Sequence, residues 1–168
     1  WVDSLKYVLD ILVYKKEIQK IIMNYDWIRP EGWRIKTFGG KAPGPSGMQS
    51  MYRKLIDVLH EGDHFLSSVQ VLDICNIIAK NVLVGGSRRA AQIALGSSDD
   101  MDFINAKYML SEKPDKQHRR MSNNSIVLNE TPSDELFDEL ISRIQQSWEP
   151  GIINAQLADI KRVLWAVV

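Results

Sequence analysis

The chain has 168 residues, of which 45% are hydrophobic and 25% charged, a composition typical of a soluble globular domain with its own core. Its 21 basic residues balance its 21 acidic ones, which excludes a general attraction to nucleic acid or to a membrane surface. One cysteine excludes an intramolecular disulfide framework, and the apolar runs are too short to span a membrane, so we expect a cytoplasmic protein.

The first half of the sequence predicts helices around a long loop. An amphipathic helix opens the chain, with Leu5, Val8, Leu9 and Leu12 on one face. Residues 17–25 predict a buried strand, and residues 26–45, punctuated by Pro and Gly, predict a loop too long for a simple connector. Capping patterns at 46–49 and 67–70 then open two helices. Their predicted apolar stripes are Met48, Met51, Tyr52, Leu55 and Leu59, and Val71, Ile74, Cys75, Ile78 and Val82.

The second half alternates strands with helices. Strands are predicted at 92–95 and 126–128, a short helix between 97 and 107, and a solvated basic connection at 113–120. A further helix starts near Pro132, with an apolar face of Phe137, Leu140, Ile141, Ile144 and Trp148, and ends before Pro150. This alternation predicts an α/β fold with parallel strands. The helical pattern at the first residues and the apolar tail at 163–168 predict an excerpt of a longer protein.

The most informative stretch is residues 84–92, with the sequence VGGSRRAAQ. Glycines allow backbone N–H groups to approach an anion, and two adjacent guanidinium groups match phosphate oxygens. Taken alone, the stretch favours a structural turn that carries two solvated arginines.

Two neighbouring stretches change that assessment. Residues 28–45 read IRPEGWRIKTFGGKAPGP, and residues 119–127 read RRMSNNSIV. Together with GGSRRAAQIALG, in this order, they resemble the adenosylcobalamin-dependent ribonucleotide reductases, in particular the monomeric ribonucleoside-triphosphate reductase branch. The resemblance covers roughly residues 1–154.

The resemblance implies a fold and a set of sites. Residues 1–168 would form a single partial domain, part of the first half of a ten-stranded α/β barrel in which strands alternate with helices. The loops at 26–45 and 84–92 would be the effector and substrate-specificity loops. The second loop would act through Gly85, Gly86, Ser87, Arg88, Arg89 and Gln92. Effector phosphates would meet Arg34, Lys36 and Lys41, and the substrate would lie near Ser122, Asn123 and Asn124.

The same resemblance implies the activity of the parent protein. It would reduce ribonucleotides to deoxyribonucleotides for DNA replication by thiyl-radical chemistry, with adenosylcobalamin as cofactor, a deoxynucleotide as allosteric effector and a thioredoxin-like protein as reductant. Whether the substrate is a diphosphate or a triphosphate stays open. We expect this segment alone to be inactive, because the radical cysteine of the family lies in an Asn-Pro-Cys context that is absent from the sequence. The alternative is a free-standing nucleotide-binding regulatory module without catalysis.

Other candidate chemistries are weaker. The stretch His60-Glu61-Gly62-Asp63-His64 matches the H-E-x-x-H pattern of zinc proteases, but Gly62 and Asp63 are poor helix formers, so we predict a solvated turn and no metal site. Cys75 lies among apolar residues and predicts a buried, structural thiol. The amides of residues 122–125 are equally compatible with an Asx turn that starts the following strand.

Overall fold

The computed structural model describes residues 2–14, 20–37, 39–60, 65–84, 87–88 and 92–158. The chain forms two compact units, residues 1–90 and residues 91–168. The single partial domain predicted from the sequence stays a prediction, since two such units can belong to one larger domain.

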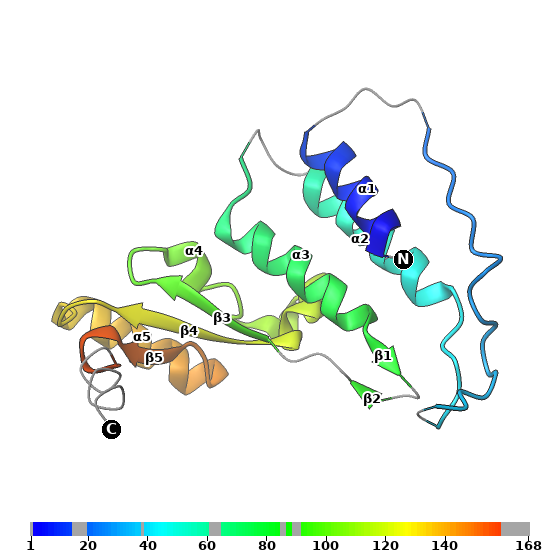
Figure 1. The fold of residues 1–168 in the computed structure, drawn as a ribbon. Helices are drawn as coiled ribbons and strands as arrows, with labels where there is room; N and C mark the ends of the chain where they lie inside the picture. The colour runs from blue at the N-terminus through cyan, green and yellow to red at the C-terminus, as the bar shows by residue number, and fades with distance from the viewer. Residues whose placement is uncertain are drawn as a thin grey trace, which may run out of the picture. The chain divides into compact units, whose positions relative to one another are not determined.

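The first unit is built on three helices, α1 (Val2–Val13), α2 (Ser46–His60) and α3 (Ser68–Asn81) (Figure 1). The predicted faces of the first two helices meet in one apolar cluster, to which α3 adds Ile74 and Ile77. The hydroxyl groups of Ser4 on α1 and Tyr52 on α2 lie 2.7 Å apart and link the two helices at its edge. The first unit is therefore held together chiefly by burial of apolar side chains.

The capping prediction is confirmed for α3. The Ser67 hydroxyl accepts a hydrogen bond from the Gln70 backbone N–H at 3.1 Å, and the Gln70 side chain accepts one from the Ser67 N–H at 2.9 Å. Its predicted apolar stripe is only partly right. The buried residues of α3 include Asp73, Asn76 and Ile77, whereas Val71 and Cys75 are exposed.

The segment before α2 is not a strand in its described part. Residues 20–25 have no strand partner, and Ile22 is exposed, which contradicts the predicted buried strand.

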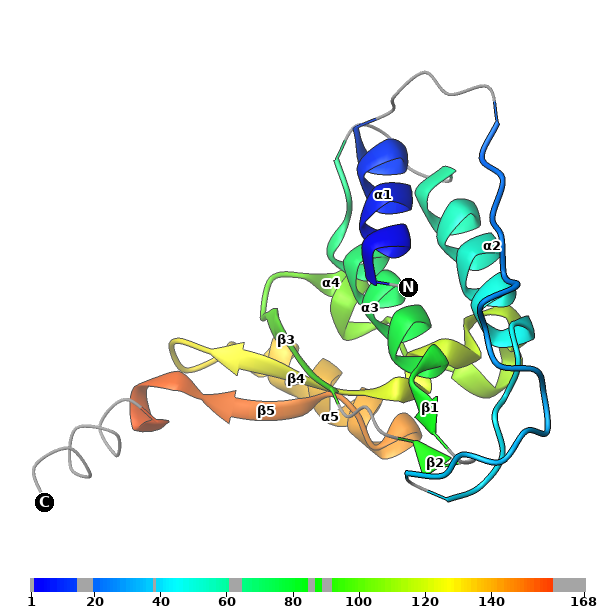
Figure 2. The ribbon, with the colours of Figure 1, turned by 45° about the vertical axis from the view of Figure 1, so that its right-hand side comes forward.

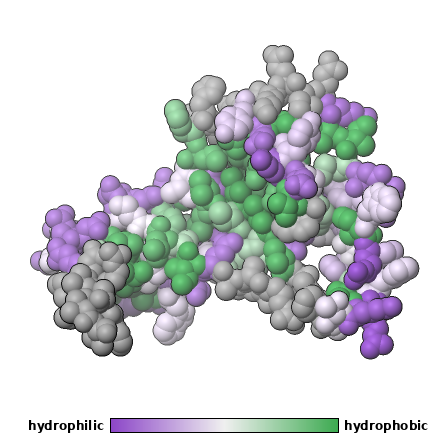
Figure 3. All heavy atoms as spheres, in the orientation of Figure 1, coloured by the Kyte–Doolittle hydropathy of each residue, from purple (hydrophilic) through white to green (hydrophobic). Residues whose placement is uncertain are grey.

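A small hairpin follows. An antiparallel bridge joins Arg34 to Lys41, and Gly39 and Gly40, with φ of 73° and 76°, turn the chain between them. Hydrophilic side chains gather along this loop at the right-hand edge of Figure 3.

The second unit contains a three-stranded sheet in the order β3 (Gln92–Ser97), β4 (Ser122–Leu128), β5 (Gly151–Asn154), with all strands parallel, as predicted (Figure 2). The helix α4 (Met101–Ile104) and two 3₁₀ helices, η1 (Leu110–Glu112) and η2 (Pro114–Met121), connect β3 to β4. The helix α5 (Asp134–Ser147) connects β4 to β5. A parallel pair needs such a crossover, because the chain must return to the same end of the sheet.

The two faces of this sheet differ. On one face Gly96 lies against the Phe103 ring of α4, and Ile126 and Leu128 are buried. On the other face Ile93 and Leu95 are 74% and 58% exposed. The predicted apolar face of α5 is covered only in part. Leu140 is buried, Ile141 and Ile144 are half-buried, and Phe137 and Trp148 are exposed.

The connection at 113–120 differs from its prediction as well. We expected a solvated basic stretch, but its central residues form η2, in which His118 and Arg119 are buried. The Arg119 guanidinium donates a hydrogen bond of 2.6 Å to the Ala106 carbonyl oxygen. The basic character of this stretch is thus partly structural.

Candidate functional site

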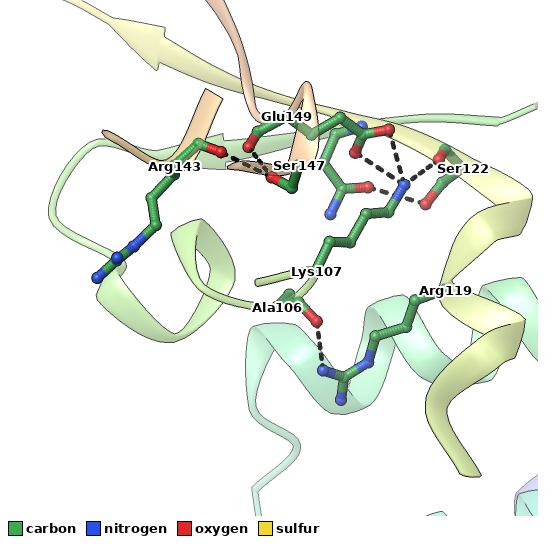
Figure 4. Close-up of polar contacts among 8 residues, drawn as sticks. Ala106, Lys107, Arg119, Ser122, Arg143, Ser147 and Glu149 are labelled. Carbon is green, nitrogen blue, oxygen red and sulfur yellow. Dashed lines mark hydrogen bonds and ion pairs between the residues drawn. The ribbon is translucent and has the colours of Figure 1, made fainter. Parts of the chain in front are cut away.

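An ion pair between a buried lysine and a half-buried glutamate lies beside the first residues of β4. The Lys107 ammonium, in a residue that is 8% exposed, lies 2.7 Å from the Glu149 carboxylate and also donates a hydrogen bond to the Ser122 carbonyl oxygen (Figure 4). Glu149 accepts a second hydrogen bond, of 3.0 Å, from the Asn124 backbone N–H. The pair therefore binds both a donor and an acceptor of the same strand, which compensates part of the cost of removing two charges from water.

The elements before β4 and β5 position these two side chains. Lys107 follows α4, whose first turn is capped by the Asp100 carboxylate on the Phe103 N–H. Glu149 follows the end of α5, where Trp148 adopts a left-handed conformation with φ of 63°. The Ser147 hydroxyl donates to the carbonyl oxygens of Arg143, at 2.9 Å, and Glu149, at 2.6 Å, and the Glu149–Pro150 peptide bond is cis.

The predicted substrate-proximal residues lie at this same place. Ser122, Asn123 and Asn124 are the first residues of β4 itself, so the Asx turn considered as an alternative is not formed. Ser122 and Asn124 are buried, and the Ser122 hydroxyl donates to the Asn124 side-chain oxygen at 2.8 Å. Asn123 points to the opposite face of the sheet and is exposed. Two of the three side chains are therefore engaged with each other.

A cavity of about 420 Å³ opens beside the ion pair. Its lining includes Lys107, Glu149, Ser122 and Asn123, together with Arg120 and Trp148 on its rim. It lies at the amino ends of β4 and β5, the end of the sheet at which Gln92 begins β3. The ion pair supports the sheet at this end through its contacts with β4. Lys107 and Glu149 escaped the sequence analysis because they are distant in the chain and match no motif.

The predicted effector-phosphate residues come together in part. Arg34 and Lys41 are cross-strand neighbours in the small hairpin, and Lys36 lies in the turn that joins them. All three are exposed. Like charges placed opposite each other repel, and the pairing of Arg34 with Lys41 concentrates positive charge on one exposed hairpin.

The predicted specificity loop is described only in part. The strands β1 (Leu83–Val84) and β2 (Ser87–Arg88) pair antiparallel, with Val84 opposite Ser87 and Leu83 opposite Arg88. Gly85, Gly86 and Arg89 lie outside the described residues. Gln92 is the first residue of β3 and is half-buried. The segment thus begins in the first unit and ends in the second.

The remaining candidates are resolved as follows. Cys75 is exposed, so the predicted burial of its thiol was wrong. His60 ends α2, and the rest of the H-E-x-x-H match, residues 61–64, lies outside the described part of the chain. Among the described residues, no group of three His, Cys, Asp or Glu side chains is placed to hold a metal ion, and no helix is long and apolar enough to cross a membrane.

Comparison with known proteins gives the family. Over 141 residues, the chain is 40% identical to an adenosylcobalamin-dependent ribonucleoside-triphosphate reductase of Lactobacillus delbrueckii subsp. bulgaricus and 39% identical to that of Lactobacillus leichmannii. The corresponding protein of Levilactobacillus brevis is 33% identical over the same length. Each match covers 83% of this chain and 18% of the relative, so the chain spans about a fifth of the length of the curated relatives it matches.

No family model and no solved structure matches the chain. The resemblance noted in the sequence motifs is nevertheless confirmed by these relatives, which share their printed name. Over its matched residues, this chain belongs to the family of the adenosylcobalamin-dependent ribonucleoside-triphosphate reductases.

Proposed function

We propose that this chain is a segment of an enzyme that reduces ribonucleoside triphosphates to deoxyribonucleotides. The observation that carries the proposal is the identity of 33–40% over most of the chain to reductases of that name. The parent enzyme would work in the cytoplasm, with a ribonucleotide substrate, a deoxynucleotide effector and a thioredoxin-like reductant, and its product would serve DNA replication. The alternative of a free-standing regulatory module has no comparable support.

The second unit would contribute strands to a ten-stranded α/β barrel. Three parallel strands joined by helical crossovers are a repeating part of such a barrel. The exposed side chains of Ile93 and Leu95 supply a second argument, because an apolar sheet face of this kind is normally covered. Further strands of the parent would complete the sheet at its β3 and β5 edges.

Adenosylcobalamin would serve the parent enzyme by generating a thiyl radical on a cysteine. We place the binding site of this cofactor in the parent enzyme and assign no residue of this chain to it. Cys75 is the chain's only cysteine and is absent from any Asn-Pro-Cys motif, so we assign the catalytic thiols to other parts of the parent. The role left to this chain is to bind nucleotides and transmit their identity.

That role would fall to the two loops. Arg34, Lys36 and Lys41 would bind the effector phosphates, since they gather three positive charges on one exposed hairpin. The segment from Gly85 to Gln92 would read the bases. A guanidinium can neutralise phosphate or stack on a base, and a side-chain amide offers a base edge both a donor and an acceptor.

The test is a matrix of reduction rates for the full-length parent with four substrates and four effectors. We expect Arg88→Ala, Arg89→Ala and Gln92→Ala to change which effector favours which substrate, with a smaller loss for the least effector-dependent substrate. Arg34→Ala should instead raise the effector concentration needed for half-maximal stimulation. A ligand shifts a loop only through contacts that differ between its two states, so removing such a contact changes the pattern of the matrix.

The matched control is Lys116→Ala. This lysine is half-buried, and its ammonium group lies 3.6 Å from the exposed carboxylate of its neighbour Asp115, an ion pair that contributes little. If the three loop variants scale every rate equally, or if the control reshapes the matrix as strongly, the assignment of the loop is wrong. If the wild-type parent forms no deoxyribonucleotide under any condition, the proposed function itself is wrong.

A further inference from the structure

We propose that Lys107 and Glu149 are positioning residues for substrate specificity, which act by fixing the strand that holds the Gln92 end of the specificity segment. This inference rests on the proposed function of the segment 85–92. Neither residue belongs to the motifs that carry the family resemblance, and the two are brought together only by the fold.

The ion pair lies at the edge of β4, before the point where β5 begins to pair with that strand. The strand β5 pairs with β4 from Ser125 onward, where Gly151 is its first partner. Ser122 and Asn124 precede this point. The Ser122 carbonyl group and the Asn124 N–H group lie on the side where β5 has not yet begun, and they bind Lys107 and Glu149 (Figure 4). The ion pair thus takes the place of a strand there and binds two backbone groups of β4.

The register between β4 and β3 connects the ion pair to Gln92. Ser122 lies opposite Gln92, and Asn124 lies opposite Ala94, in the parallel ladder. The part of β4 that the ion pair holds is therefore the part on which the first residues of β3 are aligned. Gln92 is the last residue of the predicted specificity segment, so the position of its backbone depends on β4 from one side.

The Lys107–Glu149 pair is itself held in place by further contacts. Lys107 is almost entirely buried, and both its partners have a second contact. The Glu149 carboxylate accepts a hydrogen bond from the Asn124 backbone N–H, and the Ser122 hydroxyl group donates one to the Asn124 side chain. Removing one member of a buried pair leaves the other charge without compensation, so the arrangement changes as a whole. A shift of β4 at this point would move Gln92 relative to a bound base.

The experiment compares three variants of the full-length parent in the substrate and effector matrix. Lys107→Met removes the charge and keeps the length of the side chain, and the double variant Lys107→Met with Glu149→Gln leaves no uncompensated charge. Arg143→Met is the matched control. Arg143 pairs with Glu139 at 3.0 Å and binds the Asn105 side chain at 2.6 Å, yet it has no described contact with β4.

We expect both Lys107 variants to change the ratio of kcat/KM between two substrates under one effector by roughly threefold or more, as couplings through a shared element do. Hydrogen exchange at residues 92–97 should become faster in the same variants. Arg143→Met should lower the melting temperature without changing the ratio or this exchange. A purely structural role of the pair would lower all rates together and leave the ratio unchanged.

The outcomes separate the two proposals. If the wild-type matrix depends on the effector but both Lys107 variants scale all entries equally, the positioning role is wrong and the proposed function stands. Failure of the double variant to fold, with Arg143→Met folded, would also overturn the positioning role. A wild-type parent without reduction or effector dependence would instead remove the proposed function on which the inference rests.

Discussion

At the scale of single residues, the need for glycine at position 96 comes from a neighbouring side chain and not from the backbone conformation. A Cβ atom at this position would lie 2.2 Å from the Phe103 ring, which is buried. We expect Gly96→Ala to destabilise the protein by about 1–3 kcal/mol, the usual cost of overpacking. Thermal unfolding measures this. The double variant Gly96→Ala with Phe103→Leu should recover part of the loss, and equal melting temperatures for wild type and Gly96→Ala would contradict the packing.

Asp99 makes a contribution to stability whose pH dependence has a clear sign. A hydrogen bond from the Ser97 side chain, followed by one from its own backbone N–H, lowers the pKa of its carboxyl group. A depressed pKa in the folded state gives stability that is present above the ordinary carboxyl pKa and is lost as the pH falls through the depressed value. We expect Ser97→Ala to raise the pKa of Asp99 in an NMR titration. An unchanged pKa, or the same rise in Ser98→Ala, would show another cause.

At the scale of elements, the start of α3 offers a matched pair of serines. Ser67 caps the helix through its hydroxyl group, whereas Ser68 is the first helical residue. We expect Ser67→Ala to cost about 1 kcal/mol of stability, because it leaves a helical N–H group unpaired, and Ser68→Ala to have little effect. Thermal unfolding of the two variants provides the comparison. A smaller loss for Ser67→Ala than for Ser68→Ala would show that the capping box does not stabilise the helix.

Local sequence patterns predicted some helix faces correctly and others wrongly. The apolar spacing predicted α1 and α2 and their buried faces, because residues on one side of an amphipathic helix face the same neighbour. The same reasoning placed Cys75 in the core and was wrong. On α3, polar residues such as Asp73 and Asn76 are buried, and hydropathy alone gives no sign of that.

At the scale of the whole molecule, we predict that the 168-residue chain alone forms no deoxyribonucleotide when given adenosylcobalamin, a dithiol reductant and any ribonucleotide. Its one cysteine lies on α3 and has no second thiol in the chain to supply electrons. Cys75→Ser in the full-length parent should accordingly leave the rate of reduction unchanged. Product from the isolated chain above a blank without protein, or a large loss in the Cys75 variant, would contradict this division of labour.

The sequence by itself indicated the family, the α/β class and the parallel strands, because these depend on local spacing and on short motifs. It also predicted that Ser122, Asn123 and Asn124 lie near the substrate, which stays a prediction, and it did not place them inside the strand. Only the tertiary structure decided that Arg34 lies beside Lys41 and that Lys107 binds Glu149 at the edge of β4. These contacts join residues through turns and crossovers, and a pattern along the chain carries no information on which distant side chains those connections bring together.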